Sequence, residues 1–340
     1  FKQKTAYEIM PSLVGAEMCI RDRSLLVVGS VAFDSVKTAA GARTNSLGGS
    51  ALYFSASASY FTEVSLVAVV GEDFSEVNRK TLSAREIDIS GLETAKGKTF
   101  RWEGIYDTQN LNSRETVATQ LNVFADFSPS IGKNNISHPL LFLANIDPVL
   151  QSQVLKQMNP KPKIVALDTM DYWINDHRDN LQNTIENVDV LFMDETEIKS
   201  FTSKSTIFAA AQTVREMGPR IVLVKRGEYG VLMFNEGDIF SVPAFPVQDV
   251  IDPTGAGDSF AGGFMGYLSS TNDFSPESMR RATVVASVMG SFAVEGFSTE
   301  RVGELTKLEI EDRFRGISGM TYFEPLENSE KLFIHTKTGE

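Results

Sequence analysis

The stretch DVIDPTGAGDSFAGGFMGYL, residues 249–268, decides the fold of this chain. Pro253 biases the residue before it away from helix, so an extended run should end at Asp252. Gly255-Ala256-Gly257 then opens a helix whose first turn holds Asp258. The first N–H groups of a helix have no intrahelical partner and carry a partial positive charge, and glycine lets an anion approach them closely. The pattern therefore indicates an anion site with a carboxylate beside it.

Gly255–Asp258 also has an ordinary structural explanation. Glycine-rich turns into helices are common, and an Asp in the first helical turn is often only a cap, so GAG alone favours that explanation. Two other phosphate motifs are excluded. The dinucleotide pattern G-x-G-x-x-G fails because Phe260 occupies its third glycine position, which speaks against a dinucleotide-dependent oxidoreductase. The pattern G-x-x-x-x-G-K-[ST] appears nowhere in the chain.

Apolar runs and helical patterns alternate along the rest of the chain. Buried strands are predicted at 24–34, 64–71, 140–145, 163–168, 188–193 and 220–227, with a hairpin at 229–245 that turns at Asn235–Asp238. Helices are predicted near 47–61, 72–88, 148–158, 171–186, 205–218, 256–269 and 276–292. This alternation predicts an α/β fold with a mostly parallel sheet covered on both faces, and ligands at the carboxyl ends of its strands.

Residues 99–107 and 114–124 have a different texture, because apolar and polar residues alternate in them. That pattern is typical of a sheet exposed on one face, so we expect a small antiparallel appendage, joined by residues 35–47. Trp102 and Tyr106 share parity and should point to one face, where packing is the favoured role and stacking on a ligand the alternative.

Composition excludes several classes of function. The 340 residues carry a net charge of −12, which argues against nucleic-acid binding, and no stretch has the ~20 apolar residues of a membrane helix. A single cysteine, Cys19, allows no intrachain disulfide, and the three histidines share no zinc-ligand spacing. A cytoplasmic protein is expected. Residues 1–23 resemble translated sequencing-adapter read-through and are expected to be a non-native leader.

The string DPTGAGDSFAGGF (252–264) closely resembles the C-terminal signature of the ribokinase-like, or PfkB, carbohydrate kinase family. Its other motifs are matched in order by GSVAFD (29–34), LGGSA (47–51), DETE (194–197) and KRGEYG (225–230). The resemblance covers nearly all of residues 24–310. It implies a ribokinase-like three-layer fold with a small β-sheet lid, and transfer of a phosphoryl group from ATP to a hydroxyl.

The resemblance also implies roles for single residues. Asp258 matches the catalytic base, and the anion hole is matched by Gly255, Ala256 and Gly257. The substrate-binding positions are matched by Asp34, Gly48 and Gly49, and the nucleotide-contacting positions by Lys225 and Gly227. Glu197 and Asp194 match the residues that bind magnesium through water. Asp252 matches a carboxylate near a site for a monovalent cation. ATP and Mg²⁺ are thus the expected cofactors, with K⁺ as an activator.

Two positions depart from the family pattern. Asp194 stands where the family often has Asn, and Tyr53 stands where many sugar kinases carry a substrate-binding Asn. The second departure leaves the acceptor open. Asn145 and Asp168 also end predicted strands at the ligand edge, where touching substrate and capping the next helix are about equally favoured.

The sequence therefore predicts an ATP-dependent kinase (EC 2.7.1.-) that phosphorylates a small sugar. A nucleoside kinase of the same fold, adenosine-like in its substrate, is the alternative, and a non-catalytic sugar or nucleotide sensor is a second one, although an intact Asp258 speaks against it. A dimer through the lid and a monomer both stay open. The predicted domain spans 24–315, with lid segments at 35–47 and 97–125 and a tail at 316–340.

Overall fold

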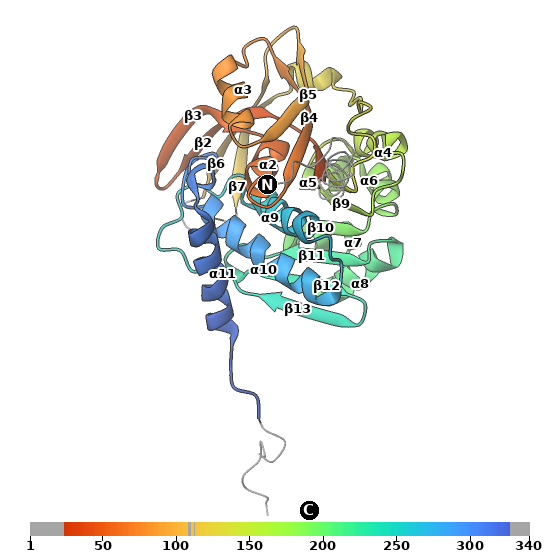
Figure 1. The fold of residues 1–340 in the computed structure, drawn as a ribbon, viewed down its shortest axis with the longest axis vertical. Coiled ribbons are helices and arrows are strands. Elements are labelled where there is room, and N and C mark those ends of the chain that lie inside the picture. Colours follow the sequence, from red (N-terminus) through yellow and green to blue (C-terminus); the bar gives the residue numbers. More distant parts are fainter. Residues whose placement is uncertain (1–23, 108–109, 112, 327–340) are drawn as a thin grey trace, which may run out of the picture.

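The computed structural model describes residues 24–107, 110–111 and 113–326 (Figure 1). The leader predicted at 1–23 and the end of the predicted tail lie outside these residues. No helix in the described part of the chain is both long and apolar enough to span a membrane. The predicted domain limits stay a prediction.

A nine-stranded sheet forms the centre of the molecule, in the order β13-β12-β11-β10-β9-β8-β1-β4-β5. Its parallel strands are β1 (Ser24–Val28), β4 (Glu63–Gly71), β5 (Ile87–Ala95), β8 (Leu140–Leu143), β9 (Ile164–Asp168), β10 (Val190–Asp194) and β11 (Ile221–Lys225). The hairpin β12 (Val231–Asn235) and β13 (Asp238–Val242) completes one edge and turns where the sequence predicted.

Helices cover both faces of this sheet, because both faces of its strands are apolar. In β1, Leu25 and Val27 enter one core while Leu26 and Val28 enter the other. The first core includes α2 (Ser50–Ala58), α9 (Ala256–Thr271) and α10 (Pro276–Ala293). The second includes α4 (Pro148–Gln157), α6 (Arg178–Ile185), α7 (Glu195–Thr202) and α8 (Ile207–Met217). The predicted ribokinase-like α/β fold is confirmed.

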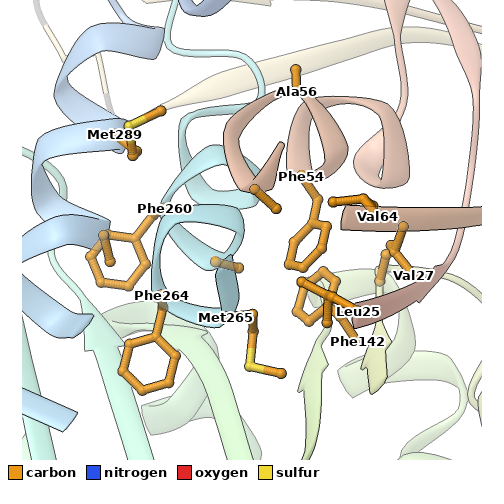
Figure 2. Packing of buried hydrophobic residues seen from close by; sticks show 14 of the residues in the cluster. Leu25, Val27, Phe54, Ala56, Val64, Phe142, Phe260, Phe264, Met265 and Met289 are labelled. Carbon is orange, nitrogen blue, oxygen red and sulfur yellow. The ribbon is translucent and has the colours of Figure 1, made fainter. Parts of the chain in front are cut away.

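Helices α2 and α9 pack closely, and this packing places the first turn of α9. Figure 2 shows Phe54 of α2 beside Phe142 of β8, and their rings stack with centroids 4.0 Å apart. A side chain at Gly262 of α9 would bring its Cβ within 2.4 Å of the Phe54 carbonyl oxygen. Glycine there lets the two helix backbones meet, so α9 begins next to the first turns of α2.

A separate four-stranded sheet has the order β3-β2-β6-β7. It comprises β2 (Ala32–Thr38), β3 (Gly41–Gly48), β6 (Phe100–Tyr106) and β7 (Arg114–Gln120), and β2 and β6 run parallel. The predicted appendage is therefore present, although it is mixed rather than purely antiparallel. Its proposed movement as a lid, and a dimer formed through it, stay predictions.

Several element boundaries differ from prediction. Residues 24–34 are not one strand, because β1 ends at Val28. The carbonyl and the hydroxyl of Ser30 accept hydrogen bonds from the first N–H groups of α2, and the chain turns there into the small sheet. The helix expected at 72–88 is the short α3 (Glu76–Ser83), followed by strand β5, whose edge position needs few buried apolar residues. The sequence also did not predict α11 (Lys307–Thr321).

Two further predicted elements are interrupted. The predicted helix 171–186 is two helices, α5 (Asp171–Asp176) and α6, because His177 leaves the helical conformation at φ −131° and ψ 31°. Strand β7 stops at Gln120, and a 3₁₀ turn over Asn122–Asp126 follows.

Candidate active site

The first turn of α9 is an uncapped helix N-terminus. Gly255 has φ +75°, a left-handed conformation that favours glycine, and no side chain caps the turn. The Ala256 N–H donates to the Pro253 carbonyl at 3.2 Å, whereas the next two N–H groups have no intrahelical partner by their position. This turn is suited to hold an anion, as the sequence predicted.

Asp258 lies in that turn, and its carboxylate has no hydrogen-bond partner among the described residues. Burial, helped by the carboxylates of Asp168 and Asp34 and opposed by Lys225 and Arg114, raises its pKa from 3.8 to about 7. A carboxylate with a pKa near 7 can take up and release a proton at neutral pH. The geometry thus fits the base predicted for Asp258.

Lys225, at the end of β11, forms an ion pair with Asp168, at the end of β9. Its Nζ lies 3.0 and 3.2 Å from the two carboxylate oxygens. Burial opposes the charge of the lysine, but Asp168 and Glu197 outweigh it and raise the pKa of Lys225. A Cβ on Gly257 would lie 3.1 Å from the same Nζ, so the ammonium group lies against the first turn of α9. Lys225 therefore adds positive charge to the anion site.

Asp34, on β2, is the second buried carboxylate near the turn. It is 5% exposed, and burial raises its pKa to about 7, while hydrogen bonds from the Tyr53 hydroxyl and the Gly49 N–H lower it. The two predicted glycines are required here. A Cβ on Gly48 would lie 1.9 Å from Asp34 Oδ2, and Gly49 begins α2 with φ +97°. The structure thus brings Asp34, Gly48 and Gly49 together.

Asp194 and Glu197 form the capping box of α7. The Asp194 Oδ1 accepts from the Glu197 N–H, and the Glu197 Oε2 accepts from the Asp194 N–H, both at 2.7 Å. Burial first, then the charges of Asp194 and Asp168, raise the pKa of Glu197 to about 8, although Lys225 opposes the shift. One oxygen of each carboxylate stays outside the box.

These oxygens suit magnesium bound through water. Mg²⁺ prefers oxygen ligands, keeps several waters and takes one or two protein carboxylates together with substrate phosphates. Over the described ranges, no group of three or more His, Cys, Asp or Glu could hold a metal by itself. The two carboxylates therefore fit a metal that arrives with a nucleotide.

Asp252 is 1% exposed and is held by the backbone. Its oxygens accept from the N–H groups of Thr254 at 2.9 Å and Ser298 at 3.4 Å, while burial raises its pKa. Asp252 therefore orders the loop before α9. Gly227, with φ +55°, turns the chain after β11, and its predicted contact with a nucleotide stays a prediction, as does the cation role of Asp252.

The small sheet touches the same loop. The Thr254 hydroxyl donates to the Tyr106 hydroxyl at 3.2 Å, and Arg114, opposite Tyr106 in the sheet, also donates to that oxygen. The positive charge of Arg114 lowers the pKa of Asp258 and of Asp171, so Arg114 contributes to the electrostatics of the site. Arg114 could not be recognised from the sequence, since nothing in its spacing indicates a contact across the two sheets.

Other candidate residues have structural partners. Trp102 packs over Gly104, where a Cβ would lie 2.2 Å from its ring, and its Nε1 lies 3.4 Å from the Thr116 hydroxyl. Packing is thus the role of Trp102. The Asn145 Oδ1 accepts from Trp173 Nε1 at 2.9 Å, so Asn145 neither caps a helix nor joins the carboxylates.

Comparison with known proteins agrees with this geometry. Residues 12–298 match the family described as pfkB family carbohydrate kinase. The chain belongs to the pfkB family. The predicted membership is confirmed, and with it the kinase class of the protein.

Two sequence relatives and one solved structure are similar to this chain. A cytidine kinase of Thermococcus kodakarensis is 31% identical over 71% of this chain and 87% of its own length. A nucleoside kinase of Methanothermobacter thermautotrophicus is 26% identical over 82% of this chain and 92% of its own. A putative ribokinase II from E. coli, in complex with ATP and Mg²⁺, has a TM-score of 0.72 at 19% identity, covering 86% of this chain and 99% of its own. The last similarity shows the fold alone.

Proposed function

We propose that this pfkB kinase transfers the γ-phosphoryl group of ATP to a hydroxyl of a nucleoside. The observation that carries the proposal is Asp258, a partly buried carboxylate with a pKa of about 7 in the uncapped first turn of α9. Two relatives are named as cytidine and nucleoside kinases, which favours the nucleoside alternative over the sugar.

The residues of the site have separate tasks in this proposal. Asp34 holds the acceptor, and Asp258 takes the proton of the attacking hydroxyl. The first turn of α9 and Lys225 stabilise the negative charge that develops on the transferred group. ATP supplies that group. Asp194 and Glu197 would hold Mg²⁺ through water, and the ion would neutralise negative charge on the phosphates. Tyr106 of the small sheet binds the loop before α9, and the charge of Arg114 acts on Asp258.

A coupled assay of ATP consumption tests the proposal. The full chain is assayed with Mg²⁺, with and without K⁺, against ribonucleosides, deoxyribonucleosides, pentoses, hexoses and their phosphates. The proposal predicts that a nucleoside gives the highest kcat/KM. A sugar that exceeds every nucleoside would overturn the choice of acceptor, and ATP binding without turnover of any compound would favour the sensor alternative.

A further inference from the structure

The Asp34 carboxylate, which the proposed function assigns to the acceptor, already accepts hydrogen bonds from the Gly49 N–H and from Tyr53. The Tyr53 hydroxyl donates to Asp34 Oδ2 at 3.2 Å. On another side, a Cβ on Gly48 would lie 1.9 Å from Oδ2 but 2.9 Å from Oδ1, so Oδ2 lies against the Gly48 backbone. Oδ2 is therefore the more enclosed of the two oxygens.

Tyr53 cannot move away without disturbing the anion site. It is 3% exposed, and its ring lies against Gly255, where a Cβ would be 2.3 to 2.6 Å from three ring carbons. Burial and the nearby carboxylates Asp34 and Asp252 raise the pKa of Tyr53, so the phenol keeps its proton and stays a donor. Tyr53 thus bridges the acceptor carboxylate and the first turn of α9.

An unoccupied carboxylate can accept one hydroxyl on each oxygen and so bind both hydroxyls of a vicinal diol. Resting on the proposed function, we propose that Tyr53 is a specificity-determining residue, because it holds Oδ2 and leaves Asp34 to accept a single acceptor hydroxyl. The kinase should then need only one of the two ribose hydroxyls of a nucleoside. The sequence pointed to this position only as a departure from the family pattern.

The test compares cytidine, 2′-deoxycytidine and 3′-deoxycytidine as acceptors, or the same series of another nucleoside if the panel prefers it. For the unaltered protein, only one of the two deoxy analogues should lose kcat/KM, by roughly 10- to 100-fold, the usual size of one hydrogen bond to a charged group. Tyr53→Phe removes the hydroxyl that binds Oδ2, so this oxygen can accept a second ribose hydroxyl and both deoxy analogues should lose kcat/KM relative to cytidine. The readout of this variant is the ratio of kcat/KM between each deoxy analogue and cytidine, because Tyr53 also contacts Gly255 of the anion site.

Tyr60→Phe is the matched control. The Tyr60 hydroxyl binds the Val302 carbonyl at 2.7 Å and the Leu305 N–H at 3.0 Å, away from Asp34. Its loss should lower the melting temperature without changing the ratio between acceptors.

The outcomes separate the two proposals. If the unaltered protein loses kcat/KM equally with both deoxy analogues, the role of Tyr53 is wrong, while nucleoside phosphorylation still stands. The same holds if Tyr53→Phe folds and keeps the original ratios of kcat/KM between the acceptors. Absence of turnover with every nucleoside would instead refute the proposed function, and with it the inference that rests on it.

Discussion

Replacing Asp258 by Asn should remove most turnover and stabilise the protein at the same time. The turnover loss is the usual contribution of a general base, on the order of 10²–10⁴-fold. The gain in stability follows from burial, because a carboxyl whose pKa is about 7 when folded has an ordinary value of 3.8. Its ionisation therefore costs the folded state about 4 kcal/mol above pH 7, at about 1.4 kcal/mol for each pH unit.

The effect of Asp258 on the free energy of unfolding depends on pH. Between pH 3.8 and about 7 the folded state binds more protons than the unfolded state, so the contribution of Asp258 to stability is present below this window and lost as pH rises through it. Asn does not titrate. The gain from Asp258→Asn should thus grow from roughly 2 kcal/mol at pH 5 to about 4 kcal/mol at pH 8.

Urea unfolding at pH 5, 6 and 8, together with the ATP-consumption assay, measures both effects. Asp312→Asn, on the exposed face of α11, is the control and should retain turnover. Turnover of Asp258→Asn at the original rate would refute the assignment of the base. A stability difference that does not change with pH would refute the argument from burial.

The other predictions concern the groups around Asp258. Gly255→Ala should abolish turnover and lower the melting temperature, because the new Cβ meets the Tyr53 ring. Gly237→Ala is its control: Gly237 has a similar φ of +70° but open space around it, so this variant should keep turnover and lose only about 1–2 kcal/mol of stability. Lys225→Met should destabilise the fold by about 3–5 kcal/mol in urea unfolding, since it leaves Asp168 buried without a counter-charge. Adding Asp168→Leu should restore stability but not turnover, and no recovery would contradict this explanation. Arg114→Gln should move the acid limb of the pH profile of kcat/KM above pH 7, because Arg114 lowers the pKa of Asp258. If the acid limb does not move, Arg114 does not act on the site.

The sequence predicted the layers of this protein because its strands are apolar on both faces. A run such as SLLVV (24–28) can only be buried between two layers of helices, and its alternate residues do enter two cores. The turn at Gly255–Asp258 was recognisable from its glycines, since the left-handed φ of +75° at the start of α9 favours glycine. The sequence could not predict β5, whose edge position demands little of its residues.

Contacts between distant segments were decided by the tertiary structure alone. Local patterns place Asp258 on a helix and Asp34 on a strand, but only packing of α2 against α9 brings Tyr53 between them. The same holds for the Lys225–Asp168 pair and for Arg114, which reaches the site from another sheet. Periodicity reports which face of an element is buried, whereas pKa values and bond partners depend on neighbours that are far away in the chain.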